Sequence, residues 1–244
     1  MVKKFKEGRW DLTDILKNHK GKEFENLLKE LESKVEKFES FRVELRPDIS
    51  VNKLLDMLKV AEEIKIISGR IGAYAGLWTS MNTKNQEARA FEHKMSNYLS
   101  ELGNKMIFFS LWFKSLDDEN MNRVIREAGV YSYYFERIKA GKQYALTEAE
   151  EKIINIKDVT GGEALNSIYD VITNAFIYDF KINRKVKKVT GDELRSNFSN
   201  PNAKIRERSY KLLLNKYGEN KDSLGEIYKN IVTEIGRASC RERV

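Results

Sequence analysis

The sequence predicts a mainly α-helical fold of long antiparallel helical hairpins, with one small β-hairpin at about residues 178–189. Three observations favour this fold class. Only two prolines, Pro47 and Pro201, interrupt the 244 residues. Lys, Glu and Leu, which form helices readily, are abundant. Apolar residues recur at steps of three and four over long stretches, as they do on one face of a helix.

The first half of the chain contains three such stretches. The first covers residues 24–38, the second residues 54–78 and the third residues 91–113, where the period stays close to 3.6 residues throughout. The polar segment 82–85 that joins the second stretch to the third is short. These two stretches should therefore pair as a long antiparallel helical hairpin at about residues 51–115.

The second half of the chain contains helix start and stop signals. Thr147 to Glu150 and Thr190 to Glu193 both have the spacing of a capping box. Gly161-Gly162 should end the first of these helices, and the next helix should run over residues 165–176. Asn200-Pro201 has the pattern of an N-cap followed by proline at the first helical position.

Between those helices the period changes from helical to alternating. Tyr178, Phe180 and Ile182 alternate with polar neighbours, and the apolar positions Val186 and Val189 are expected to alternate back. The residues between the two runs, 183–184, are expected to form the turn. This pattern predicts a β-hairpin.

The residues provide no pair of nucleophile and base and no zinc signature. The chain has two histidines, His19 and His93, and one cysteine, Cys240. We expect His19 in a loop and His93 on the polar side of its helix, both as solvated side chains rather than catalytic bases. Two distant histidines also cannot make up a zinc ligand set. We therefore predict no catalytic, cofactor-binding or metal-ligating residue in this chain.

Two other patterns have ordinary structural explanations. The carboxylate pairs Asp117-Asp118 and Glu150-Glu151 point in different directions on a helix, so helix starts and caps explain them better than acid–base catalysis. Gly69, Gly72 and Gly76 lie within a helical pattern, whereas a phosphate cradle needs a turn between strand and helix. We expect them to let another helix approach closely.

The surface charge does not indicate a nucleic-acid partner. The net charge is +7, but the acidic residues are spread through the same segments as the basic ones, which is typical of a mixed-sign surface. A solvated turn explains the basic residues of the predicted hairpin, which are Lys181, Arg184, Lys185, Lys187 and Lys188.

The aromatic run formed by Tyr131, Tyr133, Tyr134 and Phe135 has two interpretations. It could pack between helices, with the phenol hydroxyls reaching polar partners, or it could line a cleft in a longer protein.

The sequence predicts neither a membrane anchor nor a leader. No apolar run approaches the roughly 20 residues that cross a bilayer. No apolar segment follows the basic residues 1–6. We therefore expect a soluble, cytoplasmic protein without a membrane partner.

The last eleven residues, 234–244, differ from the rest of the chain. They contain its one cysteine and three arginines, and they resemble the translation of a sequencing adapter. The helical pattern is still in register at Val232 when this string begins. We expect the string to be non-native and residues 1–233 to be the front of a longer protein.

The order of features along residues 10–232 resembles a known family, the oligoendopeptidase F group of zinc metallopeptidases, relatives of thimet oligopeptidase. The resemblance rests on joint order and spacing of short motifs: Trp10-Asp11-Leu12, Arg70 to Tyr74, Asn82 to Asn85, Tyr131 and Tyr134 ahead of Arg137, Leu146-Thr147 with Glu150-Glu151, Gly161, Thr190 and Leu194, then Asn202, Arg206 and Tyr210.

This resemblance implies a function for a longer parent protein. Such proteins are mostly helical, have a deep cleft, and hydrolyse short peptides in the cytoplasm. Their single zinc ion is held by an H-E-x-x-H helix and a further glutamate, all in the C-terminal part. The present chain has no H-E-x-x-H motif. The resemblance therefore implies zinc and peptide substrates for the parent, and an inactive fragment that binds no zinc alone.

The resemblance also implies a domain organisation. Residues 1–200 would be the N-terminal helical region, which forms one wall of the cleft. Residues 201–233 would begin the peptidase domain, and the missing C-terminal half of the same chain would be the partner of this fragment.

Two other functions are compatible with the residues. One is a non-enzymatic helical scaffold that binds a protein partner through its long hairpin. The other is a basic nucleic-acid binder, which would bind nucleic acid with a steep dependence on salt concentration.

Overall fold

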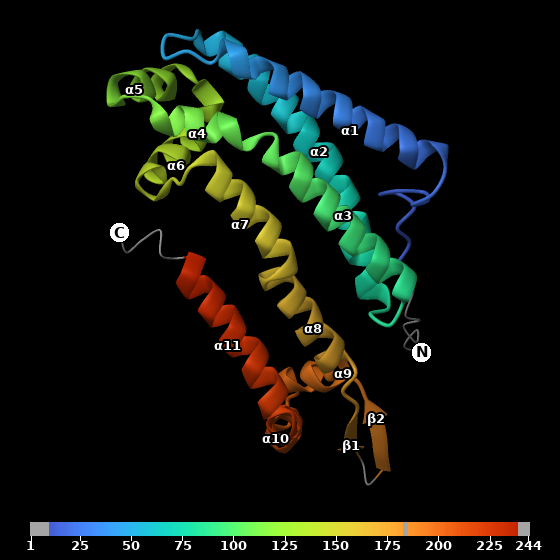
Figure 1. Ribbon diagram of the computed structural model, residues 1–244. Helices are drawn as coiled ribbons and strands as arrows, with labels where there is room; N and C mark the ends of the chain where they lie inside the picture. The colour runs from blue at the N-terminus through green and yellow to red at the C-terminus, as the bar shows by residue number, and fades with distance from the viewer. Residues whose placement is uncertain (1–9, 183–184, 239–244) are drawn as a thin grey trace. The chain divides into compact units, whose positions relative to one another are not determined.

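The computed structural model describes residues 10–182 and 185–238 and confirms a mainly α-helical fold with one small two-stranded sheet (Figure 1). These residues divide into two compact units between Val159 and Thr160. Each unit has its own hydrophobic core and is described by itself. Among the described helices, none combines the length and the apolarity needed to cross a membrane.

The first unit is built on three long helices that pack side by side (Figure 1). They are α1 (Lys22–Ser40), α2 (Val51–Met81) and α3 (Gln86–Asn104). The shorter helices are α4 (Ile107–Ser115), α5 (Asp118–Glu127), α6 (Ser132–Ala140) and α7 (Glu148–Thr160), with 3₁₀ turns at Phe41–Glu44, Gly129–Tyr131 and Lys142–Tyr144.

Polar side chains define where α2 and α3 begin. The Ser50 hydroxyl accepts a hydrogen bond from the Lys53 amide, and the Asn85 side chain accepts from the amides of Glu87 and Ala88. These bonds satisfy backbone donors that have no partner within the helix. The connection between the two helices is therefore short and well defined, as the sequence predicted.

The predicted helical stretch over residues 91–113 is wrong at one point, because the helix breaks between α3 and α4. The amides of Lys105 and Met106 bond to carbonyls three residues back, at 3.1 and 2.9 Å. Such bonds tighten the backbone into a 3₁₀ turn. Gly103 and Asn104, both poor helix formers, precede the break. As a result, α4 begins anew and can point different side chains into the core.

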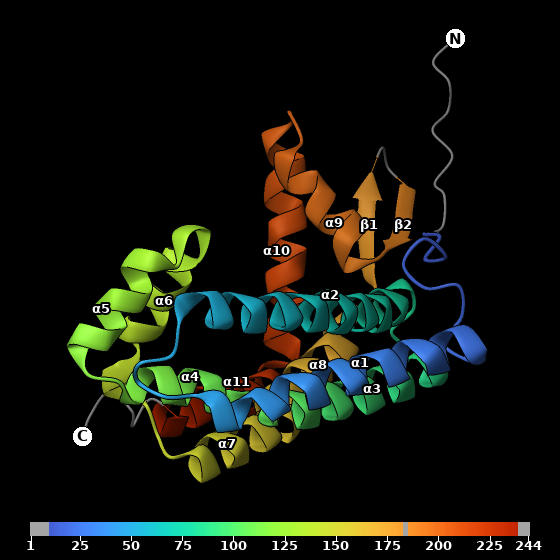
Figure 2. The ribbon, with the colours of Figure 1, turned by 90° about the horizontal axis from the view of Figure 1, so that it is seen from above.

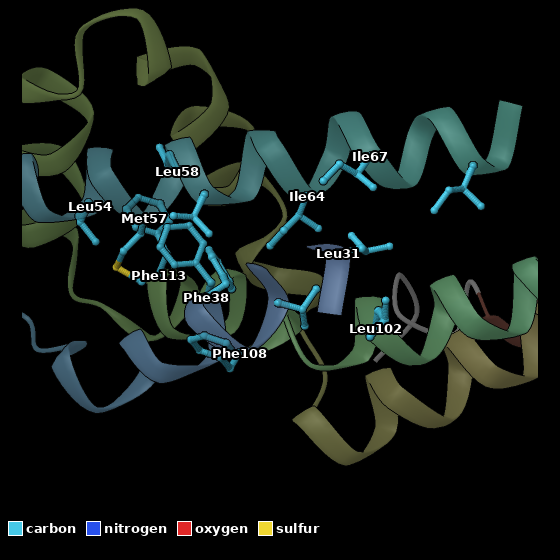
Figure 3. Close-up of a cluster of buried hydrophobic side chains, with 14 of the residues drawn as sticks. Leu31, Phe38, Leu54, Met57, Leu58, Ile64, Ile67, Leu102, Phe108 and Phe113 are labelled. Atoms are coloured by element: carbon cyan, nitrogen blue, oxygen red, sulfur yellow. The ribbon is translucent and has the colours of Figure 1, made fainter. Parts of the chain in front are cut away.

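Large side chains from helices α1 to α6 form the core of the first unit, part of which is drawn in Figure 3. The rings of Phe38 and Phe108 are 5.5 Å apart, and those of Phe113 and Phe135 are 4.8 Å apart. Complete burial of one such ring stabilises the fold by about 1.5–3 kcal/mol. The side chains of α1 on the predicted face are buried or half-buried, which confirms its period.

The expectation of a solvated His19 is wrong. Its ring lies 4.4 Å from that of Trp78 and 5.2 Å from that of Phe91, and its side chain is only 15% exposed. The segment before α1 folds back over α2, where the Arg70 side chain donates to the Ile15 carbonyl. These contacts join residues far apart in sequence, so no local pattern could reveal them. His93, in contrast, is exposed.

The glycines of α2 are less crowded than expected. A methyl group on Gly72 would lie 3.8 Å from Leu99 Cδ1, and one on Gly76 would lie 3.6 Å from Glu92 Oε1. Both are ordinary van der Waals distances. Nothing lies within 4 Å of the same position on Gly69. Gly72 and Gly76 do face α3, but α3 does not come close enough to any of the three glycines to exclude a larger residue there.

The second unit consists of five helical segments and the β-hairpin, which lies beside α9 (Figure 2). The sheet pairs Tyr178 with Val189 and Phe180 with Lys187. Phe176, Leu194 and three residues of the strands make its core. The elements are α8 (Gly162–Asn174), β1 (Tyr178–Ile182), β2 (Lys185–Val189), α9 (Gly191–Arg195), a 3₁₀ turn at Ser196–Ser199, α10 (Ala203–Glu219) and α11 (Lys221–Ala238).

Two details of this unit differ from the sequence analysis. Val186 is 63% exposed, because it lies three residues from Val189 and side chains of a strand alternate between faces. The N-cap of α10 is Asn202, whose side chain accepts from the Lys204 amide, and not Asn200. Asn200 instead accepts from the Asn202 amide, so proline lies in a turn before the helix.

Two other predictions on this half of the chain are confirmed. Thr147 with Glu150, and Thr190 with Glu193, each make the reciprocal bonds of a capping box. A helix break does occur at Gly161, between α7 and α8.

The expected turn at Asn183-Arg184 lies outside the described residues, and so do residues 239–244 of the suspected tail. Helix α11 continues through Ala238. The non-native origin of residues 234–244 and the predicted domain boundary at residue 200 both stay predictions.

We expect Gly69→Ala to stabilise the first unit by about 0.5–1 kcal/mol, because alanine favours the helix and meets no neighbour at this position. Urea unfolding followed by circular dichroism measures the change. Gly129→Ala is the matched control and should destabilise, since the φ angle of Gly129 is +57°. A loss of stability in Gly69→Ala would mean that this face of α2 is covered.

Candidate functional site: a hollow at the start of α7

The first unit has a hollow of about 560 Å³, open to solvent, at the start of α7. Three segments line it: the 3₁₀ turn after α1, helix α4, and the residues that lead into α7. Its size falls in the range of sites that hold small ligands. It is therefore the candidate functional site of this unit.

Helix α4 supplies the apolar wall. Phe109 and Phe113 of this helix point into the core and are buried, whereas Leu111 and Trp112 line the hollow and are half-buried. Residues three and four apart lie on the same face of a helix, so Phe108 joins this wall. Leu146, which precedes α7, adds a further apolar side chain to the lining. The break at residue 105 matters here, because it sets which side chains of α4 face the hollow.

The charged groups of the hollow are not balanced. Glu148 contacts both Arg42 and Lys152, with 2.7 Å between Lys152 Nζ and Glu148 Oε1. The Arg42 guanidinium also lies 5.0 Å from the centroid of the Phe108 ring, within the range of a cation–π contact. Lys114 lines the hollow and has no ion pair within the described part of the chain. The lining thus holds two cations, Arg42 and Lys114, and one carboxylate, which Lys152 also contacts.

These contacts affect the ionisation of Glu148. The hydrogen bond from Lys152 is the largest cause that lowers the pKa of Glu148, and Arg42 adds to it, while partial burial acts in the opposite direction. The carboxylate is therefore charged at neutral pH. It ties the end of α1 to the start of α7.

Capping bonds hold the rim of the hollow at the start of α7. The Thr147 amide donates to Glu150 at 2.9 Å, and the Leu146 amide donates to Glu151 at 3.3 Å. The Thr147 hydroxyl and amide together lower the pKa of Glu150. The pair Glu150-Glu151 therefore caps a helix, as predicted. Asp117 likewise caps α5 by accepting from the Asn120 amide.

The aromatic run lies apart from the hollow. Phe135 is buried in the core, Tyr133 is exposed and Tyr134 is partly exposed. A hydrogen bond to Glu62 raises the pKa of Tyr131, and burial raises the pKa of Tyr134. Packing between helices thus explains Phe135. The alternative, that this run lines a cleft in a longer protein, stays a prediction.

The basic residues of the β-hairpin do not gather into a site in the described structure. Lys187 Nζ lies 2.9 Å from Glu193 Oε1, and the Lys181 carbonyl accepts from Arg208. Lys185 and Lys188 are exposed, and Arg184 lies outside the described residues. The solvated turn itself stays a prediction.

No residues of the described chain fit a zinc ion. Residues 10–182 and 185–238 contain no group of three or more His, Cys, Asp or Glu side chains that could hold a metal. A zinc site needs three or four such ligands in contact with the ion. We therefore assign no metal chemistry to any residue described here.

The sequence pattern marks little of the hollow. Leu146, Thr147 and the carboxylates that follow stand out in it only as motif and cap residues. The available signal was Leu111-Trp112 beside Lys114, an apolar pair outside the core-facing stripe of its helix. Arg42 could not be found in this way, since its contact with Glu148 spans 106 residues.

Comparisons with known proteins confirm the resemblance drawn from the sequence. A family model for the N-terminal domain of peptidase M3, described as Oligopeptidase F, matches residues 112–177. The "Oligoendopeptidase F, plasmid" of Lactococcus lactis subsp. cremoris is 24% identical over 223 residues. An "Oligoendopeptidase F homolog" of Lactococcus lactis subsp. lactis is similar to the same degree.

Each alignment covers 85% of this chain but only 35% of the relative, so the chain spans about a third of their length. A crystal structure of a Chlamydophila abortus protein assigned as a peptidase has the same fold, with a TM-score of 0.53 and 14% identity. That superposition covers 96% of this chain and 40% of the other.

We expect Glu148→Gln to destabilise the chain by about 1 kcal/mol at pH 7, because a partly exposed carboxylate that pairs with two cations is lost. A lowered folded-state pKa means that this stabilisation is present above the usual value of 4.5 and is lost as pH falls through the folded pKa. Urea unfolding at pH 7 and pH 3 should show the difference between variant and parent shrink. A difference that is equal at both pH values would contradict this origin.

Proposed function

We propose that this chain, an oligoendopeptidase F-like N-terminal region, forms one wall of the substrate cleft in a zinc-dependent peptidase that hydrolyses short peptides. The observation that carries the proposal is the similarity, over 85% of the chain, to proteins named oligoendopeptidase F. The family-model match and the structural neighbour support the same peptidase family.

In this proposal the chain supplies binding, and the chemistry belongs elsewhere. The described residues do not fit a zinc ion. We propose that an H-E-x-x-H helix in the remaining part of the parent protein holds the zinc ion, which would polarise the peptide carbonyl and activate water. The chain itself would bind and orient the peptide and limit the size of substrates. Alone it would be inactive.

The second unit carries features that support a large partner. Apolar side chains on three of its helices are exposed to solvent. Large apolar side chains of this kind become buried where an interface forms over them. We propose that the C-terminal peptidase half of the same protein covers them, and that the protein works in the cytoplasm without nucleic-acid or membrane partners. The side chains are Ile168 of α8, Tyr210 and Leu214 of α10, and Tyr228 and Val232 of α11.

The intact gene tests this proposal directly. We expect genomic sequencing across Thr233 to give an open reading frame that continues beyond Val232 and encodes H-E-x-x-H. An intact frame without two histidines one helical turn apart would remove the peptidase function and favour the helical scaffold.

Peptide hydrolysis should require both this chain and the remaining part of the parent protein. The 244-residue chain should leave a fluorogenic peptide uncleaved, and metal analysis should find no stoichiometric zinc, because the described residues lack a ligand set. Co-expression with the remaining part should produce cleavage that a chelator abolishes. A Glu→Gln change within H-E-x-x-H is the control and should also abolish it. Hydrolysis by the chain alone would contradict the proposal.

A further inference from the structure

The hollow at the start of α7 combines an apolar wall with an excess of positive charge. Its walls are apolar, since Phe108, Leu111, Trp112 and Leu146 line it. Its charged groups carry excess positive charge, because Glu148 is shared by two cations and Lys114 has no ion pair within the described residues. A positive charge beside an apolar wall favours a ligand that has a carboxylate next to a large apolar group.

The contacts of Lys114 account for the position of its aliphatic side chain, but they provide no partner for its ammonium group. Its Cε lies beside Gly141, which follows α6, so the aliphatic part of the side chain packs on the protein. The ammonium group gains nothing from that packing. In contrast, the neighbouring Lys142 donates to the Leu116 carbonyl at 2.7 Å and has a clear structural role.

We propose that this hollow binds the carboxyl-terminal residue of a short peptide whose last side chain is large and apolar. The free carboxylate would contact Lys114, with Arg42 as a second donor from its position over Phe108. The apolar side chain would pack between Trp112 and Leu146. That the ligand is a peptide rests on the proposed function. The cations and the apolar wall of the hollow indicate the carboxylate and the apolar group without it.

The volume and the charges disfavour other parts of a peptide. A hollow of about 560 Å³ can hold one large side chain with its backbone. The amino terminus of a peptide would face an excess of cations and be repelled. An acidic last side chain would find the positive charge but would leave the wall of Phe108, Leu111 and Trp112 without an apolar partner.

Calorimetric titration of the 244-residue chain tests the proposal with matched ligands. We expect acetyl-Ala-Phe with a free carboxylate to bind about ten times more tightly than its amide, the loss that follows removal of one charge-assisted contact. Acetyl-Ala-Asp should bind more weakly than acetyl-Ala-Phe. Equal affinity for the acid and the amide, or no binding of either, would overturn the proposal.

Variants separate binding in the hollow from a general effect of charge. Lys114→Met keeps the length of the stem and should remove the preference for the acid over the amide, with an unchanged circular dichroism spectrum. Lys65→Met, an exposed position on α2, is the matched control and should retain the preference. Ala145→Phe should fill the hollow and abolish binding of both ligands. Equal loss in both lysine variants would contradict the site.

Two further outcomes separate this inference from the proposed function. If 3-phenylpropionate binds as tightly as acetyl-Ala-Phe, the site recognises apolar carboxylates and the peptide assignment is wrong. If the intact protein cleaves peptides while this chain shows no preference for the acid, only the inference fails. If the preference is present but the intact gene lacks H-E-x-x-H, only the peptidase function fails.

Discussion

The burial of α2 between α1 and α3 is the constraint on which the first unit depends. This helix is 31 residues long and contributes buried side chains over most of its length, from Val51 to Ala75. A helix that packs against two neighbours needs apolar residues on more than one stripe, so its apolar face is wider than that of a helix with one neighbour. Both neighbours then need only one apolar face. The packing of α1 on α2 determines where α1 ends, and the hollow forms beside the residues that follow this end, Arg42 and Leu45.

The hollow exists because two local events occur close together in space. The break after Asn104 lets α4 start with a new helical phase, so that Phe109 and Phe113 fill the core while Trp112 stays half-buried. The ion pair of Arg42 with Glu148 holds the start of α7 against the end of α1. An unbroken helix would direct other side chains to this surface. Without the ion pair, only the capping bonds would hold the rim.

The sequence predicted those features that depend on neighbours along the chain. The helical periods of α1 and α2, the two capping boxes and the β-hairpin are confirmed, because their physical causes lie within about four residues. His19 was wrong because its aromatic neighbours, Trp78 and Phe91, are more than 50 residues away. The hollow was missed for the same reason. The poor helix formers Gly103 and Asn104 indicate the break in the third stretch, but the apolar residues continue at helical spacing across it and favour one unbroken helix.

The part of the chain that the family model matches includes some of the hollow's lining, while Arg42, Phe108 and Leu111 lie outside it. Residues 112–177 begin at Trp112 in the apolar wall and include Lys114 and all of α7. A core position such as Phe113 needs only volume and apolarity from its environment. The Trp112 ring packs on Phe109 on one side and stays half-buried, and the ammonium of Lys114 has no ion pair within the described residues. A ligand of the proposed kind would cover the remaining ring surface of Trp112 and pair with the ammonium of Lys114, two contacts that the described fold does not supply.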